Sequence, residues 1–259
     1  MKITAGSVVV GYLDNGSWSA CFGLSYRDLT LYDLMKSRRI VRNGGRELRS
    51  LCTSGNLPDS RNDVVRAFLD TTDGEWLFFV DTDMGFSREI VDQLVESADK
   101  DSRPVVGALC FAARRGPTLN MYADTYHVHP TMYQKNPDGE TGFSPYPMYP
   151  LDSIVPVDGT GAAAILIHRT VLDTVREKYG NQWFTRIGTE DGEGYYSEDL
   201  SFCLRLAELG IPIFVNTAVR TVHHKGMIYL DEEMYFTSQG LTRKGVTAGG
   251  FPRSVRDTN

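Results

Sequence analysis

Residues 75–83, Glu-Trp-Leu-Phe-Phe-Val-Asp-Thr-Asp, decide the fold that we expect for the rest of the chain. The unbroken apolar run from Trp76 to Val80 predicts a β-strand that is buried on both faces. Asp81 and Asp83 follow it directly, although acidic side chains are seldom buried unless they are paired or bind a metal. We therefore expect both carboxylates at the carboxyl end of the strand, where open α/β sheets bind ligands.

Strand and helix patterns alternate on both sides of this stretch. An α/β fold with a mostly parallel sheet, right-handed crossovers and helices in layers on its two faces is the expected result. The helix near 22–37 is expected to turn Leu24, Leu31, Leu34 and Met35 toward the sheet. The predicted strands are 7–12, 47–53, 76–80, 104–109, 163–168 and 211–216, and further helices are predicted from Ser60, over 87–100 and 169–178, and from Ser197.

Two of these helices begin with polar residues that are candidates for a site. Ser60 has the form of a helix cap and places Arg61 at a loop-to-helix junction near the acidic strand end. Ser197 is the expected cap of a later helix and places Glu198 and Asp199 in its first turn. Each has a plain structural alternative, because Arg61 suits a solvated surface and acidic residues suit the dipole at any helix start.

Residues 110–156 interrupt the alternation and hold seven of the eleven prolines. Prolines lack a backbone donor, so we expect loops or short edge strands over the ligand edge of the sheet. His127 and His129 are spaced to share a metal, but no third ligand with suitable spacing accompanies them. The segment is therefore predicted to be a flap without its own metal.

Composition limits the classes of function. The chain has 259 residues, of which 41% are hydrophobic, and contains no apolar run long enough to cross a membrane and no signal peptide, so a cytoplasmic location is expected. The four cysteines are scattered, which predicts reduced thiols. A formal charge of -6 makes nucleic acid a disfavoured partner.

The order of these motifs resembles that of GT-A glycosyltransferases, particularly family 2-like enzymes and small bacteriophage-encoded members. The resemblance implies a three-layer, Rossmann-like nucleotide-diphospho-sugar transferase fold over 1–236, with 110–156 as an acceptor-side flap and 237–259 as a flexible tail or lid. For a viral protein, the location would be the host cytoplasm. The motifs are residues 60–63, 77–84, 158–161 and 197–203, with Gly210 and His224.

The resemblance assigns Asp83 to a divalent metal, and Asp81 to the donor ribose or, through water, to the same metal. His224 matches the late histidine that completes such a site, and His223 is the second candidate. Adjacent residues on an extended segment point in opposite directions, so only one of the two should reach the metal. Oxygen ligands with one imidazole imply Mn²⁺ or Mg²⁺.

Catalytic roles also follow from the resemblance. Asp199 matches the general base that removes the proton of an acceptor hydroxyl, and Glu198 matches a residue that orients the acceptor or the helix end. Contacts to the nucleotide-sugar donor, expected to be a UDP-sugar, fall on Asp14 and Arg61 for the nucleotide and on Gly159, Thr160 and Gly161 for the sugar. These matches imply an inverting transfer.

Several alternatives stay open. A retaining GT-A enzyme shares the metal frame, and a non-catalytic nucleotide-sugar or carbohydrate-binding module shares the fold. The haloacid-dehalogenase-like phosphatases also have a strand that ends in Asp-x-Asp, but Gly85 stands here where they have Thr or Val. A protein or glycan acceptor is favoured, and a modified DNA base is also open.

Overall fold

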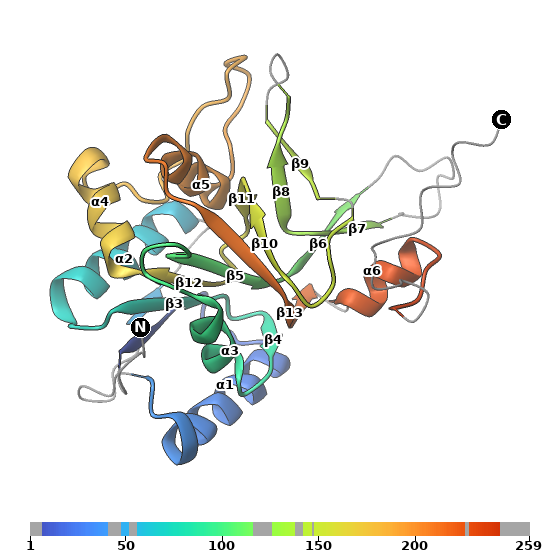
Figure 1. Ribbon diagram of the computed structural model, residues 1–259, viewed down its shortest axis with the longest axis horizontal. Coiled ribbons are helices and arrows are strands. Elements are labelled where there is room, and N and C mark those ends of the chain that lie inside the picture. Colours follow the sequence, from blue (N-terminus) through green and yellow to red (C-terminus); the bar gives the residue numbers. More distant parts are fainter. Residues whose placement is uncertain are drawn as a thin grey trace.

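The structure is a computed structural model that describes residues 7–40, 48–51, 56–115, 126–137, 142–146, 148–225 and 228–243. A mixed sheet forms its centre, with β3 (Trp76–Val80) between β1 (Val8–Asp14) and β12 (Ala164–His168) (Figure 1). All five residues of β3 are buried, as predicted from the apolar run. The complete order is β10-β13-β5-β12-β3-β1-β2, and β4 and β14 also pair with β13.

Most strands of this sheet run in one direction. β1 is parallel to β2 (Leu48–Leu51) and to β3, and β5 (Val105–Leu109) is parallel to β13 (Ile213–Lys225). Two strands run the other way, because β12 is antiparallel to β3 and β5, and β10 (Ile154–Val157) is antiparallel to β13. The sheet is therefore mixed but mostly parallel, and its parallel strands end together at one edge.

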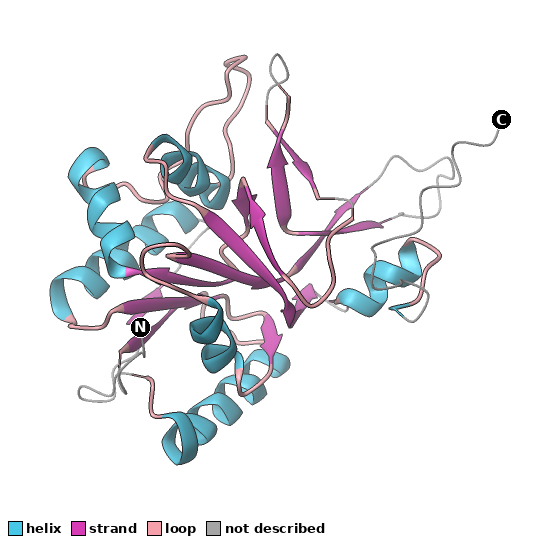
Figure 2. Ribbon diagram, viewed as in Figure 1, coloured by secondary structure: helices cyan, strands magenta, loops and turns pink. Residues whose placement is uncertain are grey.

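Alternate residues of β3 enter two separate cores. Leu77 and Phe79 pack with α2 (Leu57–Thr71), α4 (Arg169–Tyr179) and α5 (Glu198–Glu208). Trp76, Phe78 and Val80 pack with α1 (Ala20–Tyr32) and α3 (Ile90–Ser97). Figure 2 shows these helices on either side of the strands. The two cores explain why the sequence of β3 is apolar without alternation.

Short strands replace regular α/β structure between β5 and β12, as the prolines predict. β6 (Phe111–Arg115) pairs with β7 (Tyr126–Pro130), while β8 (Met132–Lys135) lies between β9 (Phe143–Pro145) and β11 (Gly159–Thr160). A third core joins this region to α6 (Glu232–Ser238). β4 (Met84–Phe86) and β14 (Ile228–Leu230) flank the far end of β13.

Local signals predicted some helix ends correctly. The Oγ atom of Ser197 accepts from Leu200 N and caps α5, as expected. Ser60 is not a cap, because α2 begins three residues earlier after Asn56 and has proline in its first turn, where a missing N–H costs nothing. Ser87 is not a cap either, because α3 begins at Ile90 and Glu89 occupies the cap position.

The predicted orientation of the first helix is wrong. α1 is followed by the π-helix η1 (Asp33–Ser37), and the pair buries Phe22 and Leu29. The four residues predicted to face the sheet, namely Leu24, Leu31, Leu34 and Met35, are exposed. Both sides of α1 are apolar, so periodicity could not identify the inner one.

Three further expectations concern the cysteines, a membrane span and the C-terminal tail. Cys21, Cys110 and Cys203 are free thiols, whereas Cys52 lies outside the described residues. No helix within the described residues has the length and apolar character to cross a membrane. The predicted tail begins inside α6, and only its part up to residue 243 is described.

Candidate active site

Several predicted residues meet where the parallel strands end. Asp81 and Asp83 follow β3, and the Thr82 hydroxyl between them donates to the Leu13 carbonyl at the end of β1. Asp14 is the last residue of β1 and is buried, and its carboxylate accepts from Gly16 N at 2.8 Å. Asp14 therefore stabilises its own turn beside the Asp81–Asp83 loop.

Asp83 meets the end of β13. Its Oδ2 atom lies 3.3 Å from His223 Nε2 and 2.6 Å from Lys225 Nζ. The other oxygen, Oδ1, is buried and has no hydrogen-bond partner. Burial alone would raise the pKa of Asp83, but the hydrogen bonds and charges of His223 and Lys225 lower it to about 2.

The structure separates the two histidines. β4 pairs with β13 so that His223 lies opposite Met84, and its side chain turns toward Asp83. The ring of His224 instead stacks on Tyr229, with centroids 4.6 Å apart and planes at 10°. His224 reaches Asp83 only through its backbone N–H, which donates to the Asp83 carbonyl. His223, the second candidate, is thus the histidine placed beside the carboxylate.

A backbone contact fixes the tautomer of His223. Its Nδ1 lies 2.9 Å from the Phe111 carbonyl, which can only accept, so Nδ1 carries the hydrogen. The 3.3 Å contact to Asp83 Oδ2 is a hydrogen bond only while Nε2 also carries a hydrogen; without that hydrogen, Nε2 presents a lone pair on the side of Asp83. Metal-binding histidines are commonly oriented by such a bond to a backbone carbonyl. Lys225 was missed in the sequence, although its position after the two histidines was a signal.

Arg61 links the two acidic motifs. Its Nη2 atom lies 3.1 Å from both carboxylate oxygens of Asp81, and its Nε lies 3.6 Å from Glu198 Oε1. The guanidinium also lies over the rings of Phe79 and Phe184, and the residue is only 3% exposed. The expectation that Arg61 is a solvated surface residue is therefore wrong, because the side chain is buried among these partners. The expected contact with a nucleotide stays a prediction.

The charge of Arg61 is secured by the same neighbours. Burial alone would lower the pKa of Arg61, but the charges of Asp81, Glu198 and Asp199 raise it above its usual value. Removing either the cation or the carboxylates would leave uncompensated charge in the interior. Phe184 is fully buried under the guanidinium, and Trp183 is a core residue that donates to the Leu172 carbonyl.

The two oxygens of Asp199 differ. Oδ1 is held by the Ser197 hydroxyl and by Leu200 N at 2.9 Å. Oδ2 lies toward the glycine turn, where a Cβ added to Gly161 would be 3.6 Å from it. Asp199 is partly exposed, so one oxygen is fixed while the other faces the edge of the sheet.

The residues of the glycine turn have different neighbours: Gly159 and Thr160 pack against α5, and Gly161 lies beside Asp199. A Cβ on Gly159 would lie 2.9 Å from Leu200 Cδ2, so this glycine permits close contact with α5. Thr160 is buried, and its N–H donates to Cys203 Sγ. Gly161 lies next to Asp199, whereas Gly159 packs against Leu200.

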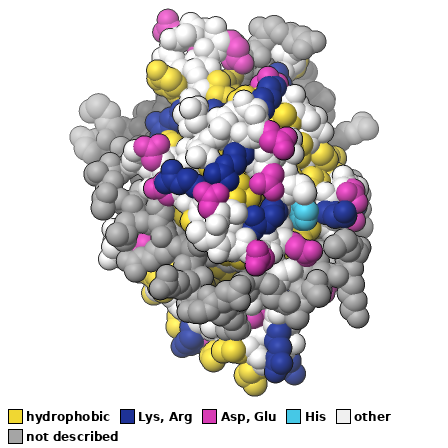
Figure 3. Space-filling model, turned by 90° about the vertical axis from the view of Figure 1, so that its left-hand side faces the viewer, with side chains coloured by type: hydrophobic (Ala, Val, Ile, Leu, Met, Phe, Trp, Pro, Cys, Tyr) yellow, Lys and Arg dark blue, Asp and Glu magenta, His cyan; other side chains and the backbone are white. Residues whose placement is uncertain are grey.

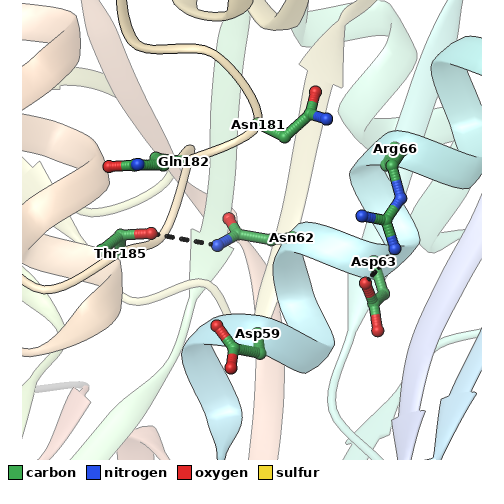
Figure 4. Close-up of a pocket in the computed structure, with 7 residues that line it drawn as sticks. All are labelled: Asp59, Asn62, Asp63, Arg66, Asn181, Gln182 and Thr185. Carbon is green, nitrogen blue, oxygen red and sulfur yellow. Dashed lines mark hydrogen bonds and ion pairs between the residues drawn. The ribbon is translucent and has the colours of Figure 1, made fainter.

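A separate polar pocket of about 510 Å³ lies between α2 and the loop after α4 (Figure 4). Asn62 belongs to its wall and also accepts from Phe184 N and donates to Thr185 Oγ1. This pocket therefore adjoins the wall of the Arg61 network but not Asp83. Its lining residues are Asp59, Asn62, Asp63, Arg66, Asn181, Gln182 and Thr185.

The described side chains do not form a complete metal cage. No group of three or more His, Cys, Asp or Glu side chains in the described part of the chain is arranged to hold a metal ion. Asp83 and His223 supply two adjacent donors, and the Asp81 carboxylate is engaged by Arg61. Mg²⁺ is usually bound by one or two carboxylates together with substrate phosphates, so two protein donors fit a cation that a diphosphate completes.

Comparison with known proteins supports the fold. The crystal structure of A197 from STIV is similar to this chain with a TM-score of 0.51, over 84% of this chain and 85% of that chain. The two sequences are 17% identical, so the likeness concerns the fold alone. Neither a protein family nor a curated protein matches the sequence.

Proposed function

We propose that this chain is a GT-A-type glycosyltransferase that moves a sugar from a nucleoside-diphosphate sugar to an acceptor hydroxyl. The mixed sheet would then be the centre of a three-layer GT-A fold. The observation that carries the proposal is the meeting of Asp83 and His223 with the Arg61–Asp81–Glu198 network and Asp199 at one sheet edge. Metal-assisted departure of a diphosphate and removal of an acceptor proton need these residue types together.

On this proposal Asp83 and His223 hold a divalent cation, Mn²⁺ or Mg²⁺, together with the donor diphosphate. The buried, unpartnered Oδ1 of Asp83 and the Nε2 lone pair of His223 are its protein donors. The bound cation supplies Lewis-acid stabilisation of charge on the leaving diphosphate. Lys225 would release Asp83 when the cation binds and could then face a phosphate oxygen.

Asp199 is proposed as the general base of an inverting transfer. Its Oδ1 accepts from Leu200 N and the Ser197 hydroxyl, which fixes the orientation of the carboxylate. Its Oδ2 would accept the proton of the acceptor hydroxyl. Arg61 would act as a positioning residue that holds Asp81 and Glu198, and we assign it that role in place of a nucleotide contact.

The phosphatase alternative fits less well. In that class the first aspartate of the motif attacks phosphorus, so one of its oxygens must be free. Both oxygens of Asp81 lie 3.1 Å from Arg61 Nη2. A phosphate-releasing activity that survives Asp83→Asn but is lost in Asp81→Asn would favour the phosphatase over the transferase.

The metal assignment is tested with a matched pair of variants. UDP with Mn²⁺ should raise the melting temperature of the wild type and of His224→Ala, whereas His223→Ala should lose most of this increase. The UDP-dependent increase should also disappear in excess chelator. Equal stabilisation of both variants, or stabilisation that persists in chelator, would contradict the cation site at Asp83 and His223.

The catalytic assignment requires a separate variant. Asp199→Asn should keep the nucleotide-dependent thermal shift and lose sugar transfer, measured by mass spectrometry of acceptors after a screen of nucleotide-sugars. Near-normal transfer by Asp199→Asn would place the base elsewhere or indicate a retaining enzyme. Nucleotide-sugar binding without transfer in the wild type would indicate a binding module.

A further inference from the structure

Exposed hydrophobic side chains gather along the first helix. Within the described residues, nine large hydrophobic side chains are exposed, and five of them lie between Trp18 and Met35. Monomeric soluble proteins rarely expose contiguous apolar patches larger than a few hundred Å², and larger patches often mark interaction sites. The five are Trp18 (43% exposed), Leu24 (54%), Leu31 (50%), Leu34 (46%) and Met35 (75%). The Trp18 ring packs edge-on against Tyr12, Phe22 and Tyr26 on the core side of the helix, so we give the name α1 face to the other four.

The α1 face has no role in the core. The opposite side of the helix already supplies Phe22 and Leu29 to the core beneath β1 and β3. Leu24, Leu31 and Met35 recur at spacings of seven and four residues, which places them in one stripe along the helix. The stripe adds apolar surface that the chain itself leaves uncovered.

Cations border the carboxyl end of this stripe. Lys36 and Arg38 are exposed, and neither forms an ion pair within the described part of the chain. The buried Asp33 carboxylate fixes the turn that carries them by accepting from Arg39 N at 2.7 Å and Ile40 N at 3.2 Å. At the lower end of the surface in Figure 3, hydrophobic side chains lie beside Lys and Arg side chains.

Acidic residues do not cancel this local charge. Asp28 lies at the edge of the stripe but is paired with Arg27 at 2.8 Å. Asp92 and Glu96 of α3 pair with Arg39. Lys36 and Arg38 are therefore left as cations without an ion pair in the described part of a chain whose formal net charge is -6. An apolar helix face with a basic border is the pattern of helices that lie in the interface of an anionic membrane.

We propose that the α1 face binds an anionic lipid surface. Leu24, Leu31 and Met35 would enter the boundary between head groups and acyl chains. A second copy of this face would bring Lys36 and Arg38 against a surface with no unpaired carboxylate among its described residues, whereas anionic head groups supply many partners. Charge complementarity thus favours lipid over self-association.

The position of α1 would keep the candidate active site close to the lipid. Ser19 N, at the amino end of the helix, donates to the Thr82 carbonyl at 3.0 Å, and Cys21 Sγ lies 3.7 Å from the Asp83 carbonyl. The lipid-binding stripe therefore begins beside the Asp81–Asp83 loop. Binding does not depend on the proposed sugar transfer, so the two proposals can fail separately.

The test is co-sedimentation of the full chain with vesicles. Wild-type protein should bind vesicles of phosphatidylcholine mixed with phosphatidylglycerol, bind less to phosphatidylcholine alone, and be released by salt. Leu31→Ser combined with Met35→Ser should lower the partition coefficient roughly tenfold or more. Lys36→Glu combined with Arg38→Glu should lower binding to the anionic vesicles by a similar factor.

Tyr195→Ser is the matched control, because Tyr195 is 74% exposed and lies outside the α1 face. It should bind vesicles like the wild type. Since Leu31 and Met35 are exposed, their replacement should leave the melting temperature nearly unchanged, which shows that the variants fold. Absence of wild-type binding, or equal binding by the Leu31→Ser/Met35→Ser variant, would overturn the proposal. A dimer in light scattering that Leu31→Ser dissociates would assign the face to a second copy instead.

Discussion

Replacement of Arg61 by methionine tests how far the buried charge network stabilises the fold. The variant keeps an unbranched apolar side chain against Phe79 and Phe184 but removes the cation between Asp81 and Glu198. Removing one partner of a buried ion pair costs about 3–5 kcal/mol, and we expect the lower end, about 3 kcal/mol, because the Asp81 side chain is 26% exposed. For a chain of this size, that corresponds to a fall in melting temperature of roughly 6–12 °C.

Urea denaturation at pH 7 measures the free energy of unfolding, with Arg66→Met as the control. Arg66 lies on the same helix and pairs with Asp63, but both side chains are about half exposed, so its replacement should cost no more than about 0.5 kcal/mol. Adding Glu198→Gln to Arg61→Met should restore part of the lost stability by removing one unpaired carboxylate. Equal costs for Arg61→Met and Arg66→Met would refute the reasoning, because solvent would then already stabilise these carboxylates.

Three further predictions concern the same edge of the sheet. The pKa of Asp83 is about 2 in the folded chain against its ordinary 3.8, so its carboxylate stabilises the fold above about pH 4 and loses this effect as the pH falls toward 2. Asp83→Asn in metal-free protein should therefore cost about 2 kcal/mol at pH 7 and almost nothing at pH 2 by urea denaturation, and equal costs at both pH values would contradict this. Gly159→Ala should lower the free energy of unfolding by about 1–3 kcal/mol, because its Cβ would lie 2.9 Å from Leu200 Cδ2; an unchanged midpoint would show that α5 can shift. Gly161→Ala should reduce sugar transfer, because its Cβ would lie in van der Waals contact, 3.6 Å, with the Asp199 oxygen proposed to accept the proton, while its tighter contacts, at 3.3 Å, are with Thr131; full activity would place the acceptor elsewhere.

Strong local patterns were sufficient for much of the fold. The apolar run of β3 predicted a strand buried on both faces because no other element so short needs apolar residues at every position. The Ser197 cap correctly marked the start of α5, since its hydroxyl accepts from Leu200 N. The common edge for Asp81, Asp83 and Asp14 followed from parallel strand direction alone.

Other features depended on contacts between distant segments. Adjacent histidines on a strand face opposite ways, but the choice of the one that reaches Asp83 depends on how β13 pairs with β4. The inner side of α1 could not be identified while both sides were apolar. The partners of Arg61 come from the loop after β3 and from the start of α5, so its burial was not a local property.

The unpartnered polar atoms connect stability with the proposed function. Four buried side-chain N or O atoms in the described residues have no hydrogen-bond partner, and two of them, Asp83 Oδ1 and Arg61 Nε, belong to the candidate site. A buried polar atom without a partner costs about 1–3 kcal/mol, so folded chains keep few of them. At Asp83 the neighbouring oxygen already interacts with His223 and Lys225, and a cation at Oδ1 would supply the missing partner. An unpartnered carboxylate oxygen beside an oriented imidazole is the arrangement that the proposed cation site requires, so loss of the UDP–Mn²⁺ thermal shift in His223→Ala but not in His224→Ala is its direct test.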